Sequence, residues 1–374
     1  MAAYRVFLYN LRTQRVTGEV PFSALSYSYV MDEPGAATVE IPIDVAAKSG
    51  KPLKPNDLFP VRTGLVIERD GELVWGGVVW TYRLNLTTRT IALNAKGYLS
   101  YYEKRHTPTY GLGFADRELT YMIRALILIA KEGIGTDTTQ LTPTNQVRSR
   151  VWNPFEFKPV ADVFRDLSDE IASIDHRTGL FGGGFFLYFE PYWKNSDRSL
   201  IGNRIRNTPN RHPYDSGVSL HQGVNCEFSD ISVDGTELAS AAFAVGATNG
   251  MRSLTPFKSD TNPALLATTP QTNKVLTENS LKQNWTLTYK VRSALAFGSE
   301  PIVLPNATTY PGKFSPLSLI PGMRAGVTTD DGFLGLVNDE YVVTENRVSV
   351  ASDGSDRLSL SLVQAELFKE TELG

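Results

Sequence analysis

Hydrophobic and polar residues alternate along much of this chain with the period of two that half-buried β-strands show. The alternation is clear over residues 4–9, 38–43, 90–95 and 357–363. Asp-Gly or Asn-Gly pairs favour two-residue hairpin turns, because both residues tolerate positive φ. Such pairs stand at positions 70–71, 234–235, 249–250, 331–332 and 353–354. The pattern predicts a mainly β protein built from short strands and tight turns.

The clearest hairpin signal lies at residues 65–80, where two alternating segments flank an Asp-Gly pair. Gly76 and Gly77 interrupt the second segment directly after Trp75. Consecutive glycines inside a strand mark a bulge or the close approach of another backbone. We therefore expect Trp75 to anchor the core and the two glycines to form a bulge that bends the strand.

Helical periodicity predicts two helices in the middle of the chain. Apolar residues at i, i+3 and i+4 spacing follow Asp116, a good N-cap residue, and end before Gly133. A second amphipathic segment begins near Pro159 and continues to Ile174. The middle of the chain is therefore expected to be an α+β domain.

The strand pattern returns in the last third of the chain. Residues 228–233 and 239–247 are expected to form a hairpin around the Asp-Gly pair between them. The polar, Pro- and Thr-rich segment 251–275 predicts a surface loop, and apolar spacing over 280–297 predicts one short helix. The remaining residues predict a β-meander.

Composition narrows the function classes. The chain has 374 residues, 41% of them hydrophobic, which is enough for a sizeable core and excludes a disordered chain. Lys and Arg number 37 against 40 Asp and Glu, so the surface lacks the excess of cations that coats nucleic acid. Cys226 is the one cysteine, which excludes an internal disulfide. The start lacks a signal-peptide pattern, and the apolar stretch 121–130 is too short to span a bilayer, so we expect folding in a reducing cytoplasm.

No stretch of the sequence carries a strong catalytic motif. There is no HExxH, GxSxG, P-loop or EF-hand pattern, and the four histidines are scattered. Asp166 and Glu170 are spaced i, i+4 and could act as an acid–base pair, although a solvated helix face is the commoner meaning. The glycines of 179–185 favour a turn over a phosphate cradle. We expect no catalytic residue, no metal and no cofactor.

Several segments together resemble the baseplate hub proteins of long-tailed actinobacterial phages, often labelled minor tail proteins. The N-terminal part carries YRVFLYNLRT, ATVEIPI and KPNDLFPVRTGLVIERDGELVWGGVVW in the order of that family. DISVDGTELASAAFAVGATNG resembles the start of its second barrel. LIPGMRAGV and YVVTENRVSVASDGSDRLSLSLV resemble its closing strands.

The resemblance implies a mainly β fold with two small β-barrel-like hub domains and inserted domains. The first hub domain would cover residues 1–105, and the second would combine 216–250 with 300–374. An α+β middle domain would occupy 106–215, and a loop and helix insertion would occupy 251–299.

The resemblance also implies a structural, non-enzymatic role in the virion, at the tail tip or baseplate. Three copies would form a ring between a sixfold tail and threefold tip proteins, and would leave a channel through which DNA passes without specific binding. Its partners would be the distal tail protein ring, the tape-measure protein and tip or fibre proteins. No membrane span is expected. The alternatives are a carbohydrate-binding adhesin or a cell-wall hydrolase, although the chain stops about ten residues after its last expected strand.

Aromatic and arginine side chains are candidates for subunit contacts, since these residue types are enriched where interfaces carry energy. Packing within the chain is an equally good interpretation of each. Besides Trp75, Gly76 and Gly77, the candidates are Tyr101, Tyr102, Arg105, Tyr192, Trp193, Arg204 and Arg206.

Overall fold

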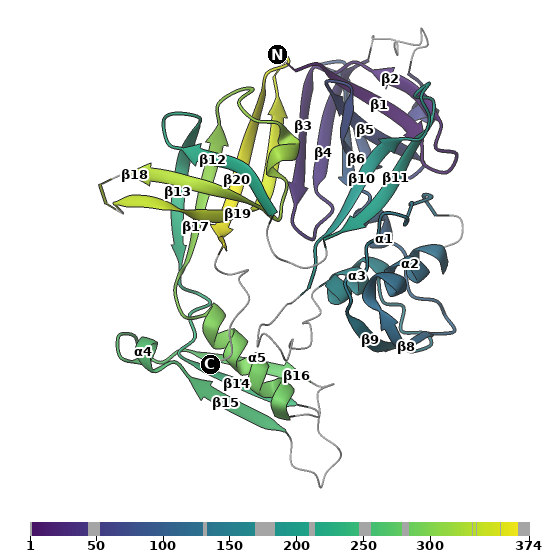
Figure 1. Ribbon diagram of the computed structural model, residues 1–374. Coiled ribbons are helices and arrows are strands. Elements are labelled where there is room, and N and C mark those ends of the chain that lie inside the picture. Colours follow the sequence, from purple (N-terminus) through teal and green to yellow (C-terminus); the bar gives the residue numbers. More distant parts are fainter. Residues whose placement is uncertain are drawn as a thin grey trace.

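A 13-stranded sheet is the largest sheet among the described residues. It fills the upper part of Figure 1, with a helical middle unit below one end and a small α/β unit below the other. No helix among the described residues is long and apolar enough to cross a membrane. The computed structural model describes residues 2–43, 53–129, 133–168, 184–208, 214–246, 256–278, 284–330, 332–333, 335–351 and 353–365.

The N-terminal half of the sheet is antiparallel, with strands in the order β3-β4-β7-β6-β5-β1-β2. A short 3-10 helix, η1 (Pro55–Leu58), precedes β5. The strands are β1 (Tyr4–Asn10), β2 (Val16–Val20), β3 (Ala24–Val30), β4 (Ala36–Pro42), β5 (Thr63–Arg69), β6 (Glu72–Asn85) and β7 (Thr90–Gly97).

The C-terminal half continues the same sheet in the order β13-β17-β20-β19, and β19 pairs with β3. Strand β18 flanks the first part of β19, and β12 pairs with β18 in parallel. A 3-10 helix, η2 (Pro316–Leu319), precedes β18. The strands are β12 (Tyr214–His221), β13 (Cys226–Asp234), β17 (Ile302–Thr309), β18 (Met323–Asp330), β19 (Leu336–Val350) and β20 (Asp356–Gln364).

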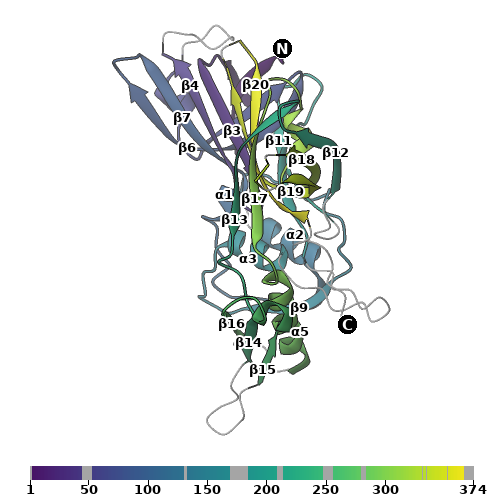
Figure 2. The same ribbon diagram turned by 90° about the vertical axis from the view of Figure 1, so that its left-hand side faces the viewer.

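The expected barrels are not closed within the described residues. The sheet path ends at β2 on one side and at β13 on the other. Closing the N-terminal half would require β3 to pair with β2, but β3 takes β19 of the other half as its partner instead. The mainly β class is confirmed, while the two halves form one continuous curved sheet (Figures 1 and 2).

Strands β1 and β5 are buried on both faces. Val6 and Leu8 of β1 point into a core that both halves share and that reaches Leu358 in β20. Phe7 and Tyr9 point the other way, into a second core formed with the middle unit. This double burial explains why β1 and β5 carry runs of consecutive buried residues in place of alternation.

The middle unit packs its helices and a hairpin against the outer face of β1, β5 and β6. Helix α3 begins where the sequence predicted, while Ile171 and Ile174 lie outside the described residues. The elements are α1 (Leu99–Tyr102), β8 (Leu112–Glu118), α2 (Leu119–Ile129), β9 (Val147–Trp152), α3 (Val160–Ser168), β10 (Leu187–Trp193) and β11 (Ile201–Asn207).

The start of α2 differs from the prediction. Asp116, the expected N-cap, lies inside β8, and the strand runs directly into the helix. Glu118 does the capping: its carboxylate accepts the backbone N–H of Tyr121 at 3.1 Å and two hydrogen bonds from Thr144 at 2.7 and 2.9 Å. Burial raises the pKa of Glu118, but a hydrogen bond from the Thr120 hydroxyl, together with those from Thr144 and Tyr121, outweighs it and holds the pKa below its usual value.

Two predictions for the region of the small α/β unit, a hairpin and a surface loop, are wrong. The hairpin expected from 228–233 and 239–247 does not form, because β13 pairs with β17 and β14 lies between β15 and β16. The expected loop 251–275 contains strands and a short helix. Small side chains in β14, Ala242 and Ala244, let α5 pack closely on this sheet. The elements are β14 (Ala241–Gly246), β15 (Phe257–Thr261), α4 (Pro263–Leu266), β16 (Asn273–Glu278) and α5 (Asn284–Phe297).

The bulges of β6 do not lie at its glycines, contrary to the prediction. Gly76 and Gly77 pair in regular register with β5, and the extra residues are Val74 and Trp80. The glycines provide space instead: a Cβ on Gly76 would lie 2.5 Å from the hydroxyl oxygen of Tyr98 and 2.9 Å from β10. Close packing, and not strand bending, requires glycine here.

Candidate assembly interface

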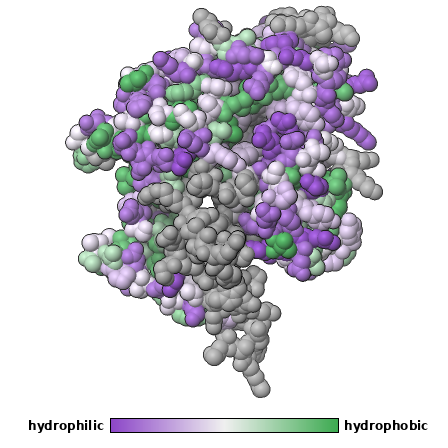
Figure 3. Space-filling model, in the orientation of Figure 1, coloured by the Kyte–Doolittle hydropathy of each residue, from purple (hydrophilic) through white to green (hydrophobic). Residues whose placement is uncertain are grey.

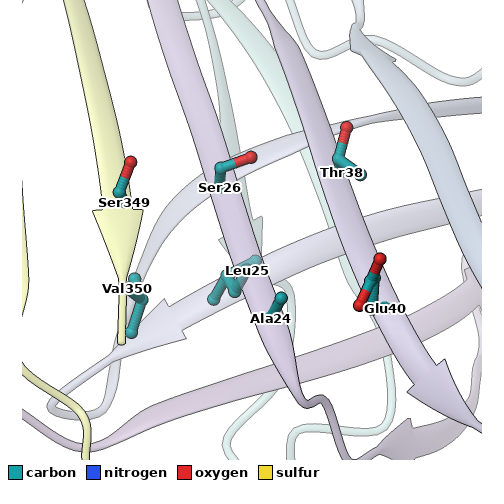
Figure 4. Close-up of a pocket in the computed structure, with 7 residues that line it drawn as sticks. All are labelled: Ala24, Leu25, Ser26, Thr38, Glu40, Ser349 and Val350. Carbon is teal, nitrogen blue, oxygen red and sulfur yellow. The ribbon is translucent and has the colours of Figure 1, made fainter. Parts of the chain in front are cut away.

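The described residues bring together no catalytic or metal-binding constellation. Asp166 is exposed and forms an ion pair with Lys158, and Glu170 lies outside the described residues. No three His, Cys, Asp or Glu residues in the described part lie close enough to hold a metal ion. A shallow pocket of about 280 Å³ lies where β19, β3 and β4 meet, and Glu40 is the ionisable residue in its lining (Figure 4).

This pocket lies on the seam where the two halves of the chain join. Strands β3 and β19 pair there, with the exposed Arg347 opposite the buried Ser28 on one face. On the other side, the side chains of the facing pairs point into the shared core. These pairs are Asn346–Tyr29, Val348–Tyr27 and Val350–Leu25.

A buried polar cluster also links the halves. Asp356, at the start of β20, is 1% exposed and accepts hydrogen bonds from the Tyr4 hydroxyl at 2.7 Å and from Arg69 Nε at 2.8 Å. Burial lowers the pKa of the Arg69 guanidinium, and the hydrogen bond and charge of Asp356 outweigh this and raise it. The cluster ties β20 to β1 and β5, so it fixes one half against the other.

The two halves repeat the same local structures. Both β6 and β19 are long central strands of a meander, and each has a bulge, at Trp80 and at Thr344. Just before each bulge, a carbonyl oxygen accepts a backbone N–H at 2.8 Å: Val79 from Val61, and Val343 from Gly322. These donors follow the 3-10 helices η1 and η2, so a helix, a turn and a meander recur in the same order.

The sequence carries a signal for this repeat that the analysis above missed. The spacing Pro-x-x-Leu-x-Pro occurs at residues 55–60 and again at 316–321. Both segments form the 3-10 helices, and Leu58 and Leu319 are buried in the shared core at 2% and 0% exposure. A six-residue pattern with three fixed positions is a weak signal by itself. The repeat is therefore recognised only when the two 3-10 helices are compared in the structure.

Strand edges without a strand partner among the described residues occur at β2 and β12, at β13, and along the last part of β6. Strand β13 ends the sheet path, so the edge facing away from β17 is open. In β6, the part before the bulge pairs with β5, but residues 81–85 pair only with β7 and are all exposed. An open edge is a template for pairing with another chain.

Apolar side chains accompany these open edges. Tyr82, Leu84 and Leu86 are 39, 48 and 77% exposed, and Val233 on β13 is 56% exposed. Elsewhere, hydrophilic and hydrophobic residues are interspersed over the face of the molecule seen in Figure 3. The sequence alone does not mark these edge residues as interface residues, because alternation does not distinguish an open strand edge from a paired one.

The predicted contact residues near α1 have partners within the chain. Tyr102 is buried and packs between Phe164 and Phe189. Tyr101 packs edge-on against Tyr102, and the guanidinium of Arg105 lies 6.0 Å from the Tyr101 ring. Their role in subunit contacts stays a prediction.

The predicted residues of the β10–β11 hairpin also make internal contacts. Trp193 packs edge-on against Phe7 of β1 at 5.4 Å. Glu190 accepts hydrogen bonds from Arg204 and Arg206 at 3.0 and 3.1 Å, and Arg204 lies over the ring of Tyr192. Arg206 is exposed and the others are half-buried, so a subunit contact here also stays a prediction.

Trp75 lies at the seam between the halves. Its side chain is 3% exposed, and its indole N–H donates to the carbonyl oxygen of Ser28 in β3 at 3.1 Å. Gly76 and Gly77 follow it in the part of β6 that is buried on both faces. The three residues therefore hold β6 against β3, β7 and β10 inside the chain.

The fold is that of phage tail proteins. The structure matches a 43 kDa tail protein of prophage MuSo2 from Shewanella oneidensis with a TM-score of 0.65 at 11% identity, over 98% of this chain and 100% of that one. It matches a tail protein from Neisseria meningitidis MC58 with a TM-score of 0.61 at 12% identity, over 98% and 99%.

A secretion-system protein shares the fold as well. The Escherichia coli c3393 protein matches with a TM-score of 0.51 at 10% identity, over 98% of this chain and 79% of that one. It is described as a component of the type VI secretion system that is structurally similar to the T4 tail proteins gp27 and gp5. No family model and no curated protein sequence matches the chain.

Proposed function

We propose that this chain is the structural hub of a phage tail tip, a ring-forming protein with no enzymatic role. The observation that carries the proposal is the internal repeat, in which two like halves lie side by side in one sheet. The similarity in fold to tail proteins, and to a protein described as similar to gp27 and gp5, supports it.

The repeat gives the hub its symmetry. Three copies of a chain with two like halves present six like units, so a homotrimer can meet a sixfold tail on one side and threefold tip proteins on the other. The partners would be the distal tail ring above and the tape-measure and tip or fibre proteins. Unspecific passage of DNA through the lumen is consistent with the net charge of −3. The sequence resemblance points to a long-tailed actinobacterial phage, whose tail would be assembled in the host cytoplasm.

The domain division follows the repeat. We assign residues 1–105 to the first hub domain, 106–215 to the middle domain and 300–374 to the second hub domain. The N-terminal segment of the second hub domain was expected to reach residue 250. Since β14 pairs with β15 and β16, we end that segment before 241 and begin the insertion there.

Deleting the gene in its phage or prophage tests the proposed function. A hub is needed to build the tail, so we expect heads without tails in electron micrographs. Expressing the wild-type gene in trans should restore complete tails and serves as the control.

The two alternatives predict other results. Loss of an adhesin leaves complete tails that fail to adsorb. Loss of a cell-wall hydrolase leaves particles that adsorb but fail to deliver DNA, and the purified protein then cleaves peptidoglycan. Complete tails from the deletion strain would contradict the hub function.

A further inference from the structure

We propose that successive copies of this chain join by pairing the open edge of β13 in one copy with the open edge of β6 in the next. The register would be the one that β3 and β19 adopt inside the chain. The proposal rests on the hub function above and names the surface through which the ring closes. A second copy of the chain then supplies the strand that each edge lacks.

Strand β6 occupies in its half the place that β19 occupies in the other. Each pairs with the preceding strand of its meander up to the bulge, at Trp80 or at Thr344. Beyond the bulge the two strands differ. Residues 345–350 of β19 take β3 as a partner on that side, whereas residues 81–85 of β6 take none within the described parts of the chain.

Strand β13 likewise occupies the place of β3. Thr38 of β4 and Asn306 of β17 each form a hydrogen bond with a side chain of the next strand inward, β7 or β20, at 3.3 and 3.0 Å. One strand outward from these positions lie Ser26 of β3 and Asp230 of β13. These two residues therefore correspond, and β13 is the counterpart of the strand that crosses the internal seam.

We apply the register of β3 and β19 to the open edges of β13 and β6. The backbone pairing then fixes every residue pair across the proposed seam. It sets Leu86 beside Phe228 at the end of the strand. It sets Thr81, Tyr82, Arg83, Leu84 and Asn85 opposite Asp234, Val233, Ser232, Ile231 and Asp230.

The side chains match in this register. The pairs Tyr82–Val233 and Leu84–Ile231 are apolar, and their counterparts in the internal seam point into the shared core. Tyr82, Leu84 and Val233 are 39 to 56% exposed in one copy. A shift by one residue would set apolar side chains against polar ones, so the observed alternation excludes the registers shifted by one.

Charges on the opposite face match as well. Arg83 would lie opposite Ser232, just as Arg347 lies opposite Ser28 in the internal seam. Asp230 and Asp234 flank Ser232 on the same face, within diagonal reach of the Arg83 guanidinium. Arg83 is exposed and has no ion-pair partner among the described residues. The proposed pairing gives the Arg83 guanidinium an ion-pair partner on each side, Asp230 and Asp234.

The pairing makes the sheet continuous around the ring. Each copy contributes eight neighbouring strands, from β13 through β17, β20, β19, β3, β4 and β7 to β6. Internal seams and subunit seams then alternate with the same strand geometry. The open edges of β13 and of residues 81–85 of β6 are then covered by neighbouring copies.

Disulfide crosslinking tests the register in the full-length protein. Tyr82→Cys combined with Val233→Cys places two exposed thiols on directly opposed strand positions, at a Cβ separation that a disulfide spans. The native Cys226 is buried, and burial raises the pKa of its thiol to about 11, so its background reactivity is low. We expect oxidation to give covalent dimers and trimers on non-reducing gels, both in the purified assembly and in intact tails.

The matched control is Tyr82→Cys with Ile231→Cys, which shifts the second thiol by two residues on the same face. Crosslinking of the control equal to that of the first pair, or none by either in intact tails, would overturn the proposed register. Three copies per tail without the crosslink would leave the hub function intact and remove only this seam. Crosslinked copies in an assembly other than a trimer would support the seam and contradict the hub.

Charge exchange provides a second test that needs no cysteine. Arg83→Glu places three carboxylates together, so we expect the association constant between copies to fall about tenfold. Arg83→Glu with Asp230→Arg and Asp234→Arg should restore it. The control is Arg357→Glu, an exposed arginine of β20, a strand that pairs on both sides. An equal loss with Arg357→Glu, or no rescue by the triple variant, contradicts the proposed ion pairs.

Discussion

Replacing Gly77 with Val should lower the free energy of unfolding by about 4 kcal/mol or more, or prevent folding. A Cβ at Gly77 would lie 2.2 Å from the carbonyl oxygen of Lys96 and 2.7 Å from its carbonyl carbon. Both atoms are backbone of the paired strand β7, so no side-chain rotation can relieve the clash. Urea unfolding of the purified variant, followed by circular dichroism, measures the loss.

Gly113→Val is the matched control for this substitution. Gly113 also lies in a strand, β8, but a Cβ there would meet only a methyl group of Val151, at 3.9 Å. We expect a change within about 0.5 kcal/mol. A Gly77→Val protein as stable as the Gly113→Val protein would show that the approach of β7 to β6 does not require glycine.

Replacing Asp356 with Ala should cost about 3 kcal/mol of stability, because it leaves the partly buried guanidinium of Arg69 with the exposed Asp70, at 3.3 Å, as its ion-pair partner. The side chain of Arg69 is 17% exposed and that of Asp356 is 1% exposed. The substitution also removes the acceptor of the Tyr4 hydroxyl. Thermal and urea unfolding should both report the loss, and the two halves of the sheet should separate more readily.

Glu340→Ala is the control for the loss of a carboxylate. Glu340 pairs with Arg324 at 3.0 Å, but its side chain is 52% exposed. An exposed ion pair contributes about 1 kcal/mol or less. Equal losses from Asp356→Ala and Glu340→Ala would mean that the buried cluster does not fix the two halves against each other.

The periodicity of the sequence predicted the strands well, because burial on one face imposes alternation. Residues 38–42 lie in β4 and residues 90–95 in β7, and residues 4–9 lie in β1 although that strand is buried on both faces. Alternation could not reveal partners, since pairing depends on residues far apart in the sequence. Ala241–Gly246 is a strand as expected, but it pairs with β15 and β16 and not with β13. The Asp-Gly pair before it therefore does not close a hairpin.

The candidate contact residues show the same limit. Aromatic and arginine side chains indicate packing sites in general, and Tyr102 and Trp193 pack inside the chain. The open edges of β6 and β13 depend on which neighbours are missing, and only the folded structure shows that. Tyr82, for example, lies on an open strand edge, where it is 39% exposed.

Counting the copies of this chain in purified, intact tails tests the hub function most directly. Quantitative mass spectrometry against a tail protein of known copy number gives the ratio. The account predicts three copies per tail. Six copies would indicate a distal-tail type of ring, and absence from the particle would mean that the protein is not a virion component. Either result would contradict the proposed trimeric hub.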